Sequence, residues 1–120
     1  MAADPPPVYT LWEQVTADLF ARTERFPKSV RQTLTHRIEN LALDVLEGIV
    51  EARYAPAARK SELLRLIDER LTRLRCVLRI ALLRRCLDPG AHEHVMRRVD
   101  EAGRMLGGWR RQAGSAGPAR

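Results

Sequence analysis

The stretch "LLRLIDERLTRLRCVLRIALLRRCL", residues 63–87, decides the fold of this 120-residue chain. Its apolar residues recur at alternating steps of three and four, which is the spacing of one face of an α-helix. We expect a helix that begins near Arg59 or Ser61, ends before the "DPG" turn at 88–90, and spans about 27 residues or about 40 Å. Its core stripe consists of Leu64, Ile67, Leu71, Leu74, Leu78 and Ala81.

Apolar residues on the C-terminal half of this helix extend beyond the core stripe. Val77, Ile80, Leu82 and Leu83 project in other directions on a helical wheel. A helix that is apolar around its circumference must be covered on more than one side, and a single four-helix bundle covers only one. We therefore expect these four residues to lie at an interface with a second subunit.

Helical spacing predicts three further helices, at 9–25, from 27 or 29 to 54, and at 91–111. The second of them carries Gly48 on its core stripe, where the missing side chain lets another backbone approach closely. The stripes are Trp12, Val15, Leu19 and Phe20; then Leu34, Ile38, Leu41, Val45, Gly48 and Ala52; and finally Val95, Val99, Ala102, Leu106 and Trp109.

Four amphipathic helices joined by short turns predict an all-α fold. The simplest arrangement is a four-helix up-down-up-down antiparallel bundle, which would assemble into a ring-like homo-oligomer. No run of alternating β-branched residues predicts a strand. We expect the bundle domain to span 9–111, preceded by a disordered proline-rich lead at 1–8 and followed by a disordered basic tail at 112–120.

Two adjacent glycines, Gly107 and Gly108, interrupt the last predicted helix. Each glycine costs a helix interior roughly 1 kcal/mol relative to alanine, so the pair calls for an explanation. One interpretation is that the glycines cap the helix and Trp109 folds back onto the bundle. The other, which we favour, is that they form a smooth patch where another backbone packs closely, as part of the oligomer interface.

The net charge of +6 favours anionic partners, with nucleic acid first. Nearly all the cations are arginines, a bias that phosphate recognition explains and that a GC-rich genome explains equally well. On spacing alone, ordinary solvated faces with Glu–Arg pairs such as Glu69–Arg73 remain an equal alternative. The residues that we expect to contact nucleic acid or a partner are Arg65, Arg73, Arg75, Arg79, Arg84, Arg97, Arg98, Arg104, Arg110 and Arg111.

No catalytic or cofactor motif is recognisable, so we expect neither an enzyme nor a small-molecule substrate. The chain has no glycine-rich phosphate loop, no nucleophile elbow and no CxxC pair. His92 and His94 resemble a metal cluster, but their side chains diverge on a helix, so we expect no metal and no cofactor.

Cysteine content and hydropathy predict a cytoplasmic protein without membrane contact. Cys76 and Cys86 lie ten residues apart in the predicted helix, too far to pair with each other, and we expect both to be small buried apolar residues. There is no signal peptide and no apolar run near 18 residues.

Three strings together resemble the accessory variability determinant (Avd) proteins of diversity-generating retroelements. They are "FPKSVRQTLTHRIENLALDVLEGIVEARY" at 26–54, the stretch quoted first, and "EAGRMLGGWRR" at 101–111. The four-helix-bundle proteins encoded in intervening sequences of ribosomal RNA genes share much of this pattern. They supply the alternative, a structural or interaction role without a reverse-transcriptase partner.

The Avd resemblance implies a homopentameric barrel of four-helix bundles with a positively charged surface. It also implies a non-catalytic protein that binds the reverse transcriptase and its template RNA or cDNA and supports mutagenic copying. Only the resemblance indicates five subunits, because general symmetry preferences favour a dimer.

Overall fold

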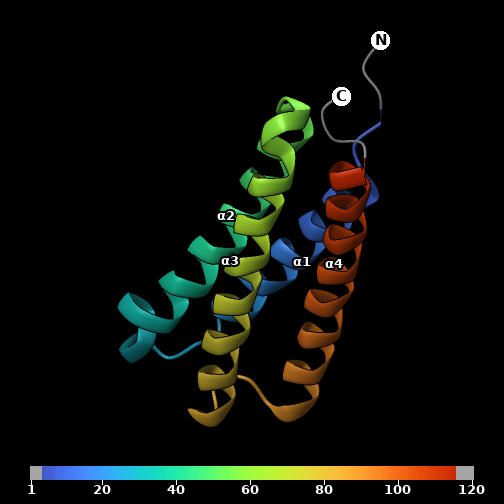
Figure 1. Cartoon of the computed structure of the whole chain (residues 1–120). Coiled ribbons are helices and arrows are strands. Elements are labelled where there is room, and N and C mark those ends of the chain that lie inside the picture. The colour runs from blue at the N-terminus through green and yellow to red at the C-terminus, as the bar shows by residue number, and fades with distance from the viewer. Residues whose placement is uncertain (1–3, 116–120) are drawn as a thin grey trace.

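The computed structural model describes residues 4–115, and within them the chain is entirely helical, without strands (Figure 1). The four helices are α1 (Pro7–Thr23), α2 (His36–Tyr54), α3 (Ala57–Leu83) and α4 (Pro89–Ser115). A short 3-10 helix, η1 (Lys28–Val30), and a π-helix, η2 (Arg31–Thr35), precede α2. The prediction of an all-α chain with four long helices is confirmed.

The helices pack in cyclic order around one core. Each helix contacts the next along the chain, and α4 also contacts α1. The molecule is elongated, with extents of 54 × 28 × 24 Å. Helices α2 and α3 lie close together near the turn that joins them and diverge towards their other ends (Figure 1).

The core contains the predicted stripes. All six stripe residues of α3 are buried, and so are those of the other helices apart from Phe20, Leu34 and Trp109, which are partly buried. Trp12 is fully buried, and its indole Nε1 donates a hydrogen bond of 2.8 Å to the carbonyl oxygen of Ala42. This bond ties α1 to α2 across the core while satisfying the one polar atom of the tryptophan side chain.

Prolines mark the starts of α1 and α4, each two residues earlier than expected. Pro7 occupies the first turn of α1, where a helix needs no backbone N–H, and Val8 after it is buried. In the same way α4 begins at Pro89, and the Asp88 side chain accepts a hydrogen bond of 2.8 Å from the Ala91 backbone N–H. The expected lead at 1–8 therefore contributes two residues to α1, and its residues 1–3 lie outside the described part.

The start of α2 differs from the single continuous helix that we expected. The chain passes through η1 and then η2 before it becomes α-helical at His36. A π-helical turn contains one more residue than an α-helical turn, which shifts the positions of the residues before it around the axis. This shift is why Leu34, at the start of the predicted stripe, is only partly buried while Ile38 is fully buried.

The last helix continues through the glycine pair to Ser115. Neither Gly107 nor Gly108 has a positive φ, so the interpretation that they cap the helix is wrong, because such caps use the left-handed conformation. Trp109 is partly buried against the core, and the Lys60 ammonium lies 5.9 Å from its ring centroid. Residues 112–115 of the expected tail are helical, and 116–120 lie outside the described residues.

Candidate interaction surfaces

Two of the four α3 residues that we expected at an oligomer interface, Ile80 and Leu83, lie at its outer surface, whereas Val77 packs partly against the core. Ile80 is 47% exposed and Leu83 is 61% exposed, whereas Val77 and Leu82 are half-buried. Helical spacing places these residues outside the core stripe, and the other three helices cover only the face of α3 that carries the stripe. The chain itself therefore leaves this surface uncovered.

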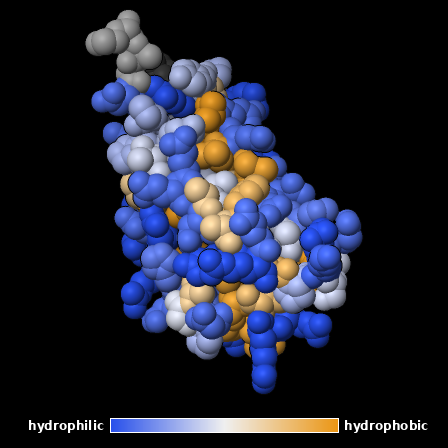
Figure 2. All heavy atoms as spheres, turned by 180° about the vertical axis from the view of Figure 1, so that it is seen from behind, coloured by the Kyte–Doolittle hydropathy of each residue, from blue (hydrophilic) through white to orange (hydrophobic). Residues whose placement is uncertain are grey.

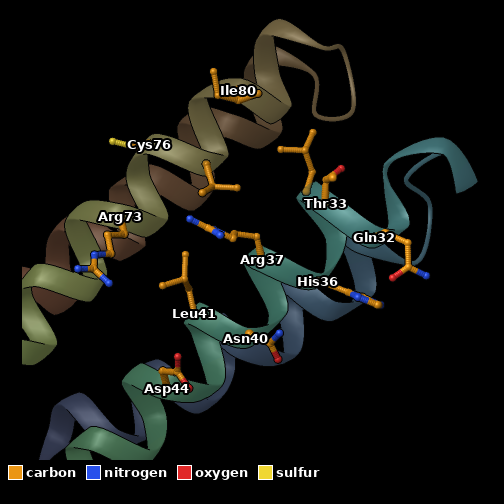
Figure 3. A pocket seen from close by; sticks show the side chains of 12 residues that line it. Gln32, Thr33, His36, Arg37, Asn40, Leu41, Asp44, Arg73, Cys76 and Ile80 are labelled. Carbon is orange, nitrogen blue, oxygen red and sulfur yellow. The ribbon is translucent and has the colours of Figure 1, made fainter.

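A groove of about 870 Å³ lies where α2 and α3 diverge (Figure 3). Its apolar lining includes Leu34, Leu41, Val77 and Ile80. The polar lining residues are Gln32, Thr33, His36, Arg37, Asn40, Asp44, Arg73 and Cys76.

Arg37 is a groove cation that our sequence reasoning missed. Its side chain points from α2 towards α3 (Figure 3), and it forms no ion pair or side-chain hydrogen bond with the described residues. The signal was present in the sequence, because Arg37 follows Leu34 by three residues and precedes Leu41 by four. That spacing places it on the edge of the core stripe of α2.

Four of the ten candidate arginines are paired with carboxylates, as the alternative of solvated Glu–Arg faces predicts. Arg65 bridges Glu62 at 2.8 Å and Glu69 at 2.9 Å. Its charged hydrogen bonds raise the pKa of the Arg65 guanidinium and lower the pKa of the Glu62 carboxyl. The other three pairs are Arg73–Glu69 at 3.6 Å, Arg75–Asp100 at 2.9 Å and Arg97–Glu93 at 3.2 Å.

Five other candidate arginines form no ion pair or side-chain hydrogen bond with the described residues, although the charge of Arg110 helps to lower the pKa of the Glu62 carboxyl. Arg98 donates only to Gln14, at 2.8 Å. The five fall into two groups. Arg79 and Arg84 lie at the C-terminal end of α3, whereas the other group lies on the C-terminal half of α4. The second group consists of Arg104, Arg110 and Arg111. Because α4 starts beside the end of α3, about 30 Å of helix separates Arg84 from Arg110.

Further cations without carboxylate partners lie near the first group. The connection from α1 to α2 and the connection from α3 to α4 lie at the same end of the bundle (Figure 1). Arg85 in the second connection adopts φ 63°, a left-handed conformation that is uncommon outside glycine. Together with Arg79 and Arg84 they place six exposed cations near this end, which also carries the exposed carboxylates Glu24 and Asp88. The additional exposed cations are Arg25, Lys28, Arg31 and Arg85.

The cysteines are less alike than expected. Cys76 is exposed at the groove, so the expectation that it is buried is wrong. The error comes from its position just outside the core stripe, beside Arg75. Cys86 is partly buried and lies beyond the end of α3, in the connection to α4.

The histidines do not form a metal centre in the described part of the chain, where no group of three or more metal-ligating side chains occurs. His94 is exposed, and His92 is partly buried with its Nε2 atom unpaired. Among residues 4–115, no helix is both long and apolar enough to cross a membrane.

A second uncovered apolar surface lies between α1 and α2. It surrounds a depression of about 570 Å³ that contains no cation, and Figure 2 shows a hydrophobic stripe along this side of the molecule. On α2, Leu43 is 36% exposed and Val50 is 40% exposed. Our sequence reasoning missed this surface, although Leu43, Leu46 and Val50 have helical spacing. The residues that line the depression are Glu13, Thr16, Ala17, Phe20, Ala21, Glu24, Leu43 and Leu46.

Comparison with protein-family models gives one finding that covers most of the chain. A family model described as bAvd-like matches residues 9–113, which include nearly all of the four helices. Comparisons with curated proteins and with solved structures gave no match.

Proposed function

The chain belongs to the bAvd-like family, and on that basis we propose that it is a non-catalytic accessory protein of a diversity-generating retroelement. In this proposal it binds the reverse transcriptase and nucleic acid, either template RNA or cDNA, and supports mutagenic reverse transcription. The observation that carries the proposal is the family match over residues 9–113. The all-helical structure of the same residues agrees with it.

Nucleic acid binding is assigned mainly to the arginines without carboxylate partners. Phosphate binding by arginine depends on charge that is not already compensated within the protein. Arg65, Arg73, Arg75 and Arg97 contribute less, because each is within ion-pair distance of an aspartate or glutamate. The main contacts are Arg79, Arg84, Arg104, Arg110 and Arg111, with Arg98 beside them.

The assembly that we propose is a ring of up-down-up-down bundles, with five copies as in the Avd family. The cyclic order of helix contacts supports the bundle topology, and the exposure of Ile80 and Leu83 supports a contact between copies. Gly107 and Gly108 belong to the same proposal, because side-chain atoms of Arg111 are the nearest neighbours that a Cβ at either position would meet. A ring repeats each cationic surface, so weak contacts with one long nucleic acid add together.

Fluorescence anisotropy with a labelled single-stranded RNA tests the nucleic acid part. We expect binding to weaken as salt rises, with a log–log slope of magnitude about 0.7 for each phosphate neutralised. The triple variant Arg104→Gln, Arg110→Gln, Arg111→Gln should bind several-fold more weakly and show a smaller slope. Arg97→Gln is the matched control on the same helix, and it should bind nearly as well as the wild type because Glu93 already compensates Arg97.

A salt-independent affinity would contradict the electrostatic assignment, and so would equal losses in the triple variant and the control. The partner is tested separately by co-purification with the reverse transcriptase of the same retroelement. A failure to co-purify in the presence and absence of RNA would contradict the accessory role.

A further inference from the structure

The two uncovered apolar surfaces found among residues 4–115 differ in charge. One is a cationic ridge at the end of α3, formed by Arg79, Ile80, Leu83 and Arg84. At about 100° per residue, these positions follow one another around the helix in the order 79, 83, 80, 84. The two exposed apolar side chains are therefore flanked on either side by an arginine without a carboxylate partner.

The other surface is the acidic depression between α1 and α2, defined by the eight lining residues given above. Glu13 and Ala17 of α1 and Glu24, which follows its last residue in a helical conformation, fall within about 40° of one another around the helix axis. The alanines at 17 and 21 leave room between the carboxylates, and Leu43 and Leu46 of α2 supply an apolar wall. Glu24 forms no ion pair with the described residues, and among them the one side-chain partner of Glu13 is the hydroxyl of Tyr9, whose pKa it raises.

The ridge and the depression cannot meet within one chain. Helix α3 packs against α2 and α4, whereas the depression is formed by α1 and α2 and lies behind the side on which α3 is seen (Figures 1 and 2). Each surface has apolar side chains at its centre and charges of one sign around them. A basic surface and an acidic depression on the same chain, each with apolar side chains, are complementary in hydrophobicity and charge.

We propose that the cationic ridge of one copy occupies the acidic depression of the next copy. The inference rests on the ring assembly proposed above and deepens it by assigning the surface opposite Ile80 and Leu83. An interface between two different surfaces is head-to-tail, and such interfaces close into rings when the rotation between copies allows it. A ridge that paired with itself would produce dimers and would place four arginines together.

Charge reversal tests this contact, with the mass of the full-length protein measured by light scattering in the absence of RNA. The ridge variant is Arg79→Glu with Arg84→Glu, and the depression variant is Glu13→Arg with Glu24→Arg. We expect each variant alone to associate at least about tenfold more weakly than the wild type, because like charges then face one another. All four residues are exposed, and circular dichroism should show unchanged helix content.

The decisive measurements combine the reversed charges of the ridge with the reversed charges of the depression. The chain that carries all four substitutions should recover the wild-type mass, and a mixture of the two double variants should associate more strongly than either variant does alone. Arg59→Glu with Arg97→Glu is the control for net charge, since it makes the same change as the ridge variant at exposed positions away from the ridge, the depression and the glycine pair. It should keep the wild-type mass.

Two other outcomes would overturn the inference in distinguishable ways. If the reversed variants keep the wild-type mass, or if the fourfold variant fails to reassemble, the copies associate through other surfaces and the ring proposal stands without this contact. If the wild-type protein is a single chain at high concentration, the ring proposal fails together with the inference. The RNA and reverse-transcriptase measurements are unaffected by either result.

Discussion

Gly48 on α2 and Ile67 on α3 approach more closely than any side chain at position 48 would allow. A Cβ atom built on Gly48 would lie 2.9 Å from Cγ1 of Ile67, a residue with no exposed surface. The sequence-based expectation that Gly48 permits a close approach is confirmed. The close neighbour is a side chain, however, and not the backbone that we expected.

Replacing Gly48 with alanine should therefore destabilise the protein. Overpacking a core costs about 1–3 kcal/mol, and the better helix propensity of alanine returns about 1 kcal/mol of that. Together these give a fall in the free energy of unfolding of about 0–2 kcal/mol, centred on about 1 kcal/mol, in urea denaturation. A greater stability of Gly48→Ala would show that α2 and α3 can separate without cost.

The glycines of α4 should respond in the opposite direction. Gly107 lies inside a helix, and a Cβ there would meet only the flexible Arg111 side chain, at 3.5 Å. Gly107→Ala should raise the free energy of unfolding of the single chain by about 0.5–1 kcal/mol, because alanine is the better helix former. If a second copy packs against this position, the same substitution weakens assembly, which light scattering at several concentrations measures. Greater stability with unchanged assembly would remove Gly107 from the interface.

The Glu62–Arg65 pair gives a prediction about pH. Arg65 holds the pKa of Glu62 below its ordinary value of 4.5 in the folded protein. A carboxyl whose folded-state pKa is lowered stabilises the fold above its unfolded pKa, and this contribution is lost as the pH falls through the lowered value. We expect NMR titration to show the pKa of Glu62 rising towards 4.5 in Arg65→Gln. Arg97→Gln, which removes a different ion pair, should leave the Glu62 titration unchanged.

The two cysteines should react with thiol reagents at different rates. Cys76 is exposed at the groove, whereas Cys86 is partly buried. An Ellman's reagent time course should show one fast and one slow thiol, and Cys76→Ser should remove the fast phase. If Cys76→Ser removes the slow phase instead, then Cys86 reacts faster than Cys76. That result would mean that the connection after α3 opens and exposes Cys86.

The sequence was sufficient for the fold because burial follows helical spacing almost residue by residue. All six predicted stripe residues of α3 are buried, and Gly48 lies at a close contact. Helix ends were less predictable, since proline at position 7 or 89 both stops one segment and starts a helix. The π-helical turn before α2 has no spacing signal of its own, so helical periodicity alone could not predict it.

The candidate site was only partly predictable, because a helical wheel shows the face of a residue and not its neighbours. Arg75 and Arg104 look alike in sequence, yet Arg75 pairs with Asp100 of another helix and Arg104 pairs with no described carboxylate. The acidic depression could not be predicted either, because a helical wheel does not show which helices are neighbours. It depends on α1 and α2 lying side by side, which brings Glu13 and Leu43 to one surface.

The succession of 3-10, π and α geometry between Lys28 and His36 has a consequence for how this chain can change over time. Val30 before the π turn and Ile38 after it are both buried, while Lys28 and Arg31 are exposed. Deleting one residue there would convert the π turn to an α turn and rotate Val30 by about 100°, out of the interior. Related chains can therefore replace the exposed residues Lys28 and Arg31, whereas an insertion or deletion in this segment would move a buried residue out of the core.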